Sequence, residues 1–410
     1  MTLQSFQSKE PAVPVRVLYS FPHKLGADRI CYTAWQQVRS LAAAGAQVVA
    51  MPGVLHRAVP ESVVVRTTLS RGKYRIPYKL LGVTNASRLH DHIVARRLEK
   101  MVGQIDIVHC WPRGALETLR TAKRLGIPTV LERPNAHTRY CYEVVAKECS
   151  RIGMSLPHRE YRHDERALRL EESEFAAADR LLCPAAFPEQ SFLNLGFPAE
   201  KLARHAYGFD DNKYFPDVAP RNPQAKFSAL FVGVDPVRKG LHLALEAWIS
   251  SPAVDNGTFM IAGEISPEFK SRFARELSHP SIAILGHRKD VPELMRHADV
   301  LFLPSLEEGS ALVCSEAIGS GCVPLVSNAC SDACRHMENS LVHQVGDVRT
   351  LQEHIAILFS NRELLGRLRE GALRSRQELT WTVAGKRLLT VYQEVLASSP
   401  RTLSSVAVAS

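Results

Sequence analysis

Short apolar runs alternate with amphipathic helical segments along this chain, and the alternation occurs in two successive series. In the first series, the predicted strands are 15–21, 47–51, 106–110, 129–132 and 181–184. In the second series, they are 227–232, 259–262, 282–285, 300–303 and 323–326. Helical periodicity separates most of them, as at 30–44 and 241–248. The alternation predicts parallel, doubly wound sheets with helices on both faces.

The chain is long enough for two domains that each bury a core. It has 410 residues, of which 45% are hydrophobic and 23% are charged, as in an ordinary globular protein. The segment 207–226 is rich in proline and polar residues, and we interpret it as the linker. We therefore expect a Rossmann-like domain at 1–215 and a second one at 216–380, with a disordered tail at 398–410. Ligands of such sheets bind at the carboxyl ends of the strands.

The segment 299–327 contains the largest concentration of candidate ligand-binding residues. A predicted strand leads into Glu308 and Gly309, and a predicted helix follows. Gly309 lets the backbone approach a ligand closely, and the N–H groups of Ser310, Ala311 and Leu312 would form an anion site at the helix start. Glu316 lies eight residues after Glu308, which corresponds to roughly 10–12 Å. This span matches that from a sugar ring across a diphosphate to a ribose.

The same segment resembles the signature of the retaining family 4 glycosyltransferases of GT-B fold. The matching residues are Pro304-Ser305, Glu308-Gly309, Glu316-Ala317 and then Gly321 and Pro324, with one extra residue in the last spacing. The resemblance implies two Rossmann-like domains facing across a cleft, with the last helix, 381–397, joining the N-terminal domain. It also implies that Glu308 faces the donor sugar and that Glu316 holds the nucleotide ribose.

A second element of the resemblance lies after the strand 227–232. The sequence there runs from Gly233 to Lys239 and Gly240, similar to the strand–glycine–loop–Lys-Gly element of the family. A lysine at the end of a strand neutralises a diphosphate leaving group, and the resemblance gives this role to Lys239. The family usually has an arginine where Val234 stands. Arg238 is therefore the candidate for the second positive charge.

Two further candidates follow predicted strands of the N-terminal half. Gly26 lies where the family commonly has adjacent glycines next to the donor phosphate and acceptor, and we expect it to allow close approach there. His137 follows the strand 129–132, where the family often has a histidine near the donor sugar and the acceptor hydroxyl. A neutral imidazole both donates and accepts hydrogen bonds at a reacting sugar. A loop histidine with a structural role is the alternative.

The net charge of +9 is confined to the N-terminal half. Residues 1–220 hold 31 Lys and Arg against 22 Asp and Glu, whereas residues 221–410 hold 20 of each. Ten basic residues fall within 57–100. They suit an anionic acceptor or anionic lipid headgroups, and a solvated basic surface is an equal alternative. Nucleic acid is not an expected partner, because no aromatic residues interleave with this charge.

The nine cysteines and the polar first residues of the chain bear on its cellular compartment. The first ten residues lack an apolar segment typical of a signal peptide. We therefore expect reduced thiols and a cytoplasmic location, extending to the inner face of a membrane. No cluster with the spacing of metal ligands is evident, and the GT-B resemblance implies that neither a metal nor any cofactor beyond the donor is needed.

The leading hypothesis is a retaining glycosyltransferase that moves a sugar from a nucleotide diphosphate sugar to a hydroxyl of a glycan or glycolipid. The second hypothesis is a protein that binds nucleotide sugars and has little transferase activity. Val234 and the single Gly26 favour it, because both depart from the pattern of the family. An epimerase or a phosphorylase on the same architecture is a third class, and the residues that either would need are not evident. These motifs do not identify the donor sugar, the nucleotide base, the acceptor or the oligomeric state.

Overall fold

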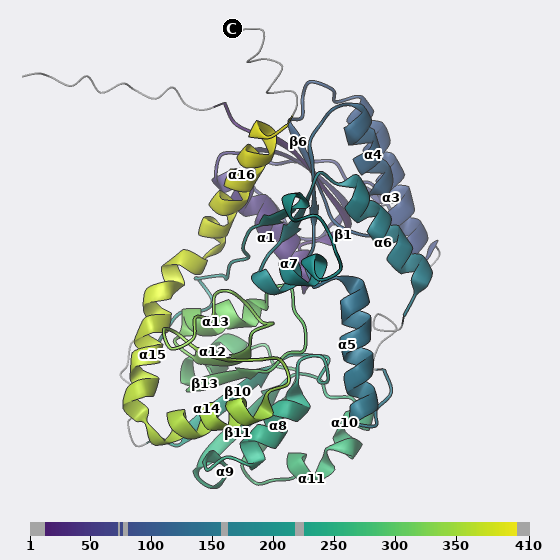
Figure 1. Cartoon of the computed structure of the whole chain (residues 1–410). Coiled ribbons are helices and arrows are strands. Elements are labelled where there is room, and N and C mark those ends of the chain that lie inside the picture. The colour runs from purple at the N-terminus through teal and green to yellow at the C-terminus, as the bar shows by residue number, and fades with distance from the viewer. Residues whose placement is uncertain (1–12, 73, 77–80, 157–162, 218–224, 400–410) are drawn as a thin grey trace, which may run out of the picture. The chain divides into compact units, whose positions relative to one another are not determined.

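A computed structural model of the chain describes residues 13–72, 74–76, 81–156, 163–217 and 225–399 (Figure 1). The chain divides into two compact units. The first comprises 1–130, 177–179 and 388–410, and the second comprises 131–176 and 180–387. The division at 215 and the cleft predicted above stay predictions. The predicted tail lies almost wholly outside the described residues, as do residues 218–224 of the predicted linker.

The N-terminal half of the chain forms a seven-stranded sheet in the order β3-β2-β1-β6-β7-β8-β9. Its strands are β1 (Arg16–Leu25), β2 (Gln47–Leu55), β3 (Val64–Val65), β6 (Ile107–Cys110), β7 (Thr129–Glu132), β8 (Arg180–Cys183) and β9 (Leu202–Arg204). β1 pairs in parallel with both β2 and β6. A small antiparallel hairpin joins β4 (Ser70–Arg71) to β5 (Tyr74–Arg75).

Helices connect these strands. They are α1 (Ile30–Ala43), α3 (Val83–Glu99), α4 (Leu116–Arg124), α5 (Thr138–Arg151), α6 (Glu165–Ala177), α7 (Ala186–Leu193) and the short η2 (Ala199–Lys201). The irregular sequence between about 135 and 163 predicts a loop with short helices, whereas α5 is one helix of 14 residues. Its Cys141, Tyr142, Val145 and Cys149 share one buried face, as helical spacing requires.

The C-terminal half forms a six-stranded sheet in the order β12-β11-β10-β13-β14-β15. Its strands are β10 (Phe227–Val232), β11 (Gly257–Ala262), β12 (Ile282–Gly286), β13 (Val300–Leu303), β14 (Val323–Ser327) and β15 (Leu341–His343). All neighbouring pairs are parallel. The chain order reverses between β10 and β13, so this pair forms the topological switch point where such sheets bind ligands.

The helices of this half lie on both faces of the sheet. They are α8 (Leu241–Ile249), α9 (Ala253–Asn256), α10 (Pro267–Arg272), α11 (Ala274–Leu277), α12 (Val291–His297), α13 (Leu312–Ser320), α14 (Val348–Ser360), α15 (Arg362–Ser375) and η3 (Arg376–Leu379). The last helix of the chain is α16 (Trp381–Ala397). The sequence predicted one helix at 268–277, whereas Phe273 separates α10 from α11.

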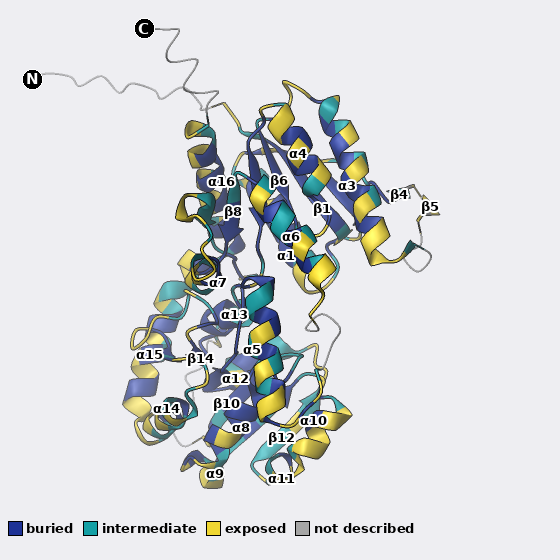
Figure 2. Cartoon of the chain, turned by 45° about the vertical axis from the view of Figure 1, so that its right-hand side comes forward, coloured by how far each residue is buried: buried dark blue, intermediate teal, exposed yellow. Residues whose placement is uncertain are grey.

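Alternate residues of the central strands enter different cores. Phe227, Ala229 and Phe231 of β10 pack in a cluster that also contains Trp248 of α8 and Ile355 of α14. Leu230, between them, packs in a second cluster with residues of α12 and α13. Side chains of a strand point alternately to the two faces, so the central strands of the sheet are buried on both sides (Figure 2). The predicted fold, α/β with two Rossmann-like sheets as in GT-B proteins, is confirmed.

The last helix belongs to both units, because α16 begins in the second and its residues from Leu388 onward belong to the first. Its Tyr392 hydroxyl lies 2.5 Å from Nδ1 of His109 in β6. This contact ties the end of the chain to the N-terminal sheet. In the described part of the chain, no helix is both long enough and apolar enough to span a membrane.

Candidate functional site

The two loops that leave β10 and β13 lie against each other in the second unit. Gly240 has φ +71°, and a Cβ added to it would lie 2.0 Å from the carbonyl oxygen of Pro304. The backbone N–H of Leu306 donates to the carbonyl oxygen of Arg238 at 2.8 Å. A glycine is needed for this approach, which a side chain would block. The basic loop after β10 is thereby held beside the acidic loop after β13.

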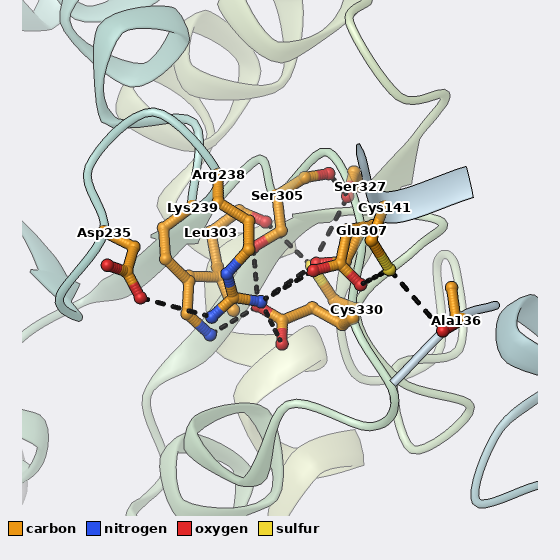
Figure 3. A network of polar contacts seen from close by, with 11 residues as sticks. Ala136, Cys141, Asp235, Arg238, Lys239, Leu303, Ser305, Glu307, Ser327 and Cys330 are labelled. Atoms are coloured by element: carbon orange, nitrogen blue, oxygen red, sulfur yellow. Dashed lines mark hydrogen bonds and ion pairs between the residues drawn. The ribbon is translucent and has the colours of Figure 1, made fainter. Parts of the chain in front are cut away.

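These two loops bring two cations and two carboxylates into one buried network (Figure 3). Lys239 Nζ donates to Glu308 Oε1. Arg238 Nη1 lies 3.2 Å from Glu308 Oε2 and 3.3 Å from Glu307 Oε1. The hydroxyl of Ser305 donates to Glu308 Oε1 at 3.0 Å. The structure thus brings together Arg238, Lys239 and Glu308, which the sequence had singled out separately.

The partners of Glu308 determine its ionisation. Burial by itself would raise the pKa of this carboxyl, but the charges of Arg238 and Lys239, with hydrogen bonds from Lys239 and Ser305, lower the pKa to about 2. An opposite charge at close range favours the ionised form, as does a hydrogen bond to it. Glu308 is therefore a carboxylate at neutral pH, and it accepts hydrogen bonds.

Glu307 belongs to the same network, although no sequence motif assigned it a role. Its side chain is 1% exposed, and its Oε2 lies 3.3 Å from Sγ of Cys141 on α5. Arg238 Nη1 also donates to the Glu307 carbonyl oxygen at 3.2 Å. The only sequence signal was the adjacent acidic pair. Its contact with Cys141 spans 166 residues and has no local signature.

In the turn before α13, one of the three backbone N–H groups predicted to bind an anion has a partner within the protein. The N–H of Ala311 donates to the carbonyl oxygen of Cys330 at 2.7 Å, so it is not free for a ligand. The expectation of a free donor there was wrong, because a distant loop satisfies that group. Ser310 and Leu312 flank Ala311, and Leu312 is the first residue of α13. The first N–H groups of a helix have no partner within the helix.

Glu316 lies one turn further along α13 in a different environment. It is half-buried, and burial raises the pKa of its carboxyl to about 7, although a hydrogen bond from Tyr214 and the charge of Lys213 favour the ionised form. The sequence did not identify Tyr214, which precedes the helix by about a hundred residues. Glu316 therefore exchanges a proton near neutral pH.

Gly309 makes a close approach to another segment of its own unit. A Cβ added there would lie 1.7 Å from the carbonyl oxygen of Pro134 and 3.0 Å from the N atom of Asn135. The loop after β7 therefore fits against the loop after β13 only because residue 309 has no side chain. A packing role of this kind was not part of the sequence prediction.

His137 is the residue that caps the N-terminus of α5. Its Nδ1 accepts from the N–H of Arg139 at 3.2 Å, and its ring packs edge-on against Phe175 and Phe192. Burial, with the charge of Arg133, lowers the pKa of the ring to about 4. The imidazole is therefore neutral at physiological pH. It lines a cavity of about 360 Å³ together with Arg139, Glu172 and residues 195–198.

Gly26 lies in the first unit, directly after β1. It has φ +89°, and a Cβ added there would lie 2.4 Å from the Arg57 Cβ and 3.2 Å from the Trp35 ring. Its lack of a side chain is therefore required by neighbours within the unit. Within the described residues, no group of three or more His, Cys, Asp or Glu side chains is arranged to hold a metal ion.

Comparison with known proteins connects this site to a family. Residues 226–361, which contain both loops of the ion network and helix α13, match the family described as Glycosyl transferases group 1. The matched segment begins immediately before β10 and covers the six-stranded sheet.

Two curated relatives align with part of the chain. One is the N,N'-diacetylbacillosaminyl-diphospho-undecaprenol alpha-1,3-N-acetylgalactosaminyltransferase of Campylobacter jejuni, 23% identical over 50% of this chain and 57% of that protein. The other is the lipopolysaccharide glucosyltransferase WaaG of Escherichia coli, 30% identical over 37% of this chain and 39% of that protein. The alignments thus span about half the length of these relatives or less.

Solved structures are similar over almost the whole chain. Sucrose-phosphate synthase from Thermosynechococcus elongatus has a TM-score of 0.70 at 16% identity, covering 94% of this chain and 100% of that one. Anabaena HepE in complex with UDP has a TM-score of 0.61 at 15% identity, covering 93% and 100%. At such identities the likeness concerns the fold. The chain therefore has a GT-B fold, and its residues 226–361 match the family described as Glycosyl transferases group 1.

Proposed function

We propose that this protein is a retaining glycosyltransferase that uses a nucleotide diphosphate sugar as its donor. One observation carries the proposal: Arg238 and Lys239 meet Glu308 at the switch point of a group 1 domain. The ion network offers two cations beside a helix N-terminus, a combination suited to a diphosphate. The activity itself is a proposal, since the relatives align over only part of their length.

In the proposed reaction the bond between the sugar carbon and the diphosphate oxygen breaks. A bond to the acceptor hydroxyl oxygen forms on the same face, and the leaving diphosphate takes the hydroxyl proton. Lys239 and Arg238 stabilise the charge that develops on the diphosphate, which is worth about 3–4 kcal/mol for one such group. In keeping with the resemblance, we assign no metal and no further cofactor to this step.

The remaining site residues position the donor. Glu308 is ionised and accepts hydrogen bonds from the sugar hydroxyls, and Glu316 accepts them from the ribose. The N–H groups of Ser310 and Leu312 face the phosphates, and His137, neutral at physiological pH, hydrogen-bonds the reacting end of the sugar. Positioning of this kind lowers the barrier by fixing the reacting atoms before the bond changes.

The donor and the acceptor are proposed by class. HepE binds UDP in its solved complex, which makes a uridine diphosphate sugar the first donor to test. The two curated relatives are named for a diphospho-undecaprenol acceptor and for lipopolysaccharide. We infer a glycolipid acceptor in polysaccharide or lipopolysaccharide assembly, and a peripheral contact of the basic segment 57–100 with a membrane. Lys73 and Lys79 of that segment lie outside the described residues.

A thermal-shift panel of nucleotide sugars tests the donor site. We expect one nucleotide class to raise the Tm of the intact chain, by an amount that grows with ligand concentration. Glu316→Ala should abolish or greatly reduce this shift. The control is Glu363→Ala, at an exposed position on α15, which should leave the shift intact. A panel in which no nucleotide sugar shifts the Tm of the intact chain would remove the proposal.

A binder of nucleotide sugars with little transfer is the second candidate. Val234 favours it, because the family usually supplies an arginine there. Release of free nucleoside diphosphate from the stabilising donor, measured with a lipid-linked acceptor extract, separates the two candidates. Binding without any release of nucleoside diphosphate would support the binder.

A further inference from the structure

A cavity in the first unit has no part in the donor site. It has a volume of about 710 Å³ and lies between the β4–β5 hairpin, the segment that follows β3, and helix α3. Its polar lining includes Arg66, Thr67 and Arg97, and its apolar lining includes Leu69, Tyr74 and Ile76. One cavity thus presents both cations and apolar side chains.

The two arginines are held close to each other. Arg97 Nη1 donates to the carbonyl oxygens of Arg66 and Thr67, at 2.9 and 3.0 Å. Burial, followed by the charge of Arg66, lowers the pKa of the Arg97 guanidinium. Arg66 Nη1 contacts the Met101 sulfur at 3.7 Å. Among the described residues, no carboxylate forms an ion pair with either arginine, so an anion would relieve their mutual repulsion.

Two apolar side chains of the cavity are exposed to solvent. Tyr74 is 85% exposed and Ile76 is 37% exposed. Tyrosine is enriched where one side of a protein meets lipid and the other meets water. A small soluble anion would use the arginines and leave these side chains in water. A lipid with a phosphate headgroup would use both.

We propose that this cavity binds the phosphate of a membrane lipid headgroup, with Arg66 and Arg97 on the phosphate and with Tyr74 and Ile76 toward the acyl region. The inference rests on the membrane contact that is part of the proposed function, and it names the site of that contact. It assigns the contact to two of the ten basic residues in the segment 57–100. Inorganic phosphate is the competing occupant, and the experiment distinguishes the two.

The test is flotation of the full chain with vesicles, without any nucleotide. We expect binding to phosphatidylcholine vesicles that contain phosphatidylglycerol and little binding to phosphatidylcholine alone. Arg66→Ala should weaken binding about fivefold, as expected for one basic residue at an anionic surface. The double change Arg66→Ala with Arg97→Gln should weaken it by more than tenfold, and Tyr74→Ser should weaken it at unchanged charge.

Arg88→Ala is the matched control. Arg88 is exposed on the same helix, nine residues before Arg97, so the two lie on opposite faces. It should change vesicle binding by less than twofold. Equal losses for Arg88→Ala and Arg66→Ala would overturn the site in favour of diffuse charge. Full displacement of the vesicles by millimolar inorganic phosphate at constant ionic strength would overturn the lipid as occupant.

The nucleotide thermal shift serves as the independent readout. All variants should keep the shift of the intact chain, which shows that they are folded and that the donor site is untouched. If the intact chain binds anionic vesicles but no nucleotide sugar, the proposed transferase function fails while the lipid site stands. If it shows the nucleotide shift but Arg66→Ala binds vesicles as well as the intact chain, the lipid site fails alone.

Discussion

Glu308 and Glu316 lie eight residues apart in one loop–helix segment, and their carboxyl pKa values shift in opposite directions. Glu308 has two cations and a hydroxyl beside it, and its pKa falls to about 2. Glu316 is half-buried with weaker support from Tyr214 and Lys213, and its pKa rises to about 7. The comparison teaches that burial alone does not decide ionisation here. The decisive factor is which groups the other loops bring to each carboxyl.

The largest expected effect comes from removing one of the two cations beside Glu308. Lys239→Ala should lower the turnover of the stabilising nucleotide sugar by about 100- to 1,000-fold, because the leaving diphosphate loses a charged partner. The measurement is the initial rate of nucleoside diphosphate release. Lys270→Ala, an exposed lysine on α10, should leave the rate unchanged. Unchanged turnover in Lys239→Ala would show that the leaving group does not depend on this lysine.

The second prediction concerns the pH dependence that Glu316 gives to folding. Its pKa is higher in the folded chain than the ordinary 4.5, so the folded state binds the proton more tightly and stability falls as pH rises from about 4.5 to 7. Glu316→Gln should remove this loss. Relative to the unmodified chain, its stability should increase by up to about 3 kcal/mol between pH 4 and pH 8. Urea unfolding at both pH values measures it.

Glu363→Gln provides the reference for that experiment, because residue 363 is exposed at the start of α15. Its stability relative to the unmodified chain should change far less between pH 4 and pH 8 than that of Glu316→Gln. A flat pH profile for Glu316→Gln as well would mean that the carboxyl of Glu316 is ionised at neutral pH like that of Glu308, and the contrast between the two would disappear.

The third prediction concerns the glycine that follows Glu308. Gly309→Ala places a Cβ against the carbonyl oxygen of Pro134, and the loops must separate, at a cost of about 1–3 kcal/mol. The Tm should fall and nucleotide binding should weaken. Gly366→Ala is the control, because nothing lies within 4 Å of its added Cβ inside α15. It should be neutral or stabilising. Equal Tm values for the two variants would contradict the close approach.

The smallest expected effect concerns the hydroxyl beside Glu308. Ser305→Ala removes one hydrogen bond to its carboxylate, at a cost of about 1 kcal/mol. Because that bond favours the ionised form, its contribution should be present above pH 4.5 and should be lost as pH falls toward 2. Acid unfolding therefore should begin at a higher pH. The control is Ser327→Ala, which removes a hydrogen bond to the Ser305 carbonyl oxygen instead. It should leave the pH at which acid unfolding begins unchanged.

Much of the architecture could be predicted from periodicity. The strands predicted at 227–232 and 300–303 coincide with β10 and β13, because both are short apolar runs bounded by polar turns. The length of helix α5 was not predicted, and only short helices were expected there, because its exposed face is rich in charged residues. Its buried positions, Cys141, Val145 and Cys149, nevertheless recur at helical spacing. The signal was present, and the irregular polar composition of the segment obscured it.

The site could be predicted only where its chemistry is local in sequence. Glu308 and Lys239 stand in recognisable motifs, and the structure brings them into contact. Tyr214 acts on Glu316 from a segment about a hundred residues away, and Cys330 occupies the N–H of Ala311 from a loop beyond the next strand. Such long-range partners determine which groups are free and how carboxyls ionise. A single sequence does not encode them as a pattern.

The pairing of Arg238 and Lys239 with Glu307 and Glu308 has a consequence for selectivity. Each cation already has an anionic neighbour, so an incoming ion must replace an existing attraction before it gains a new one. A chloride ion offers one charge and recovers little of that loss. A diphosphate offers several oxygens at once and recovers more of it. The ion network should therefore favour the proposed diphosphate donor over chloride.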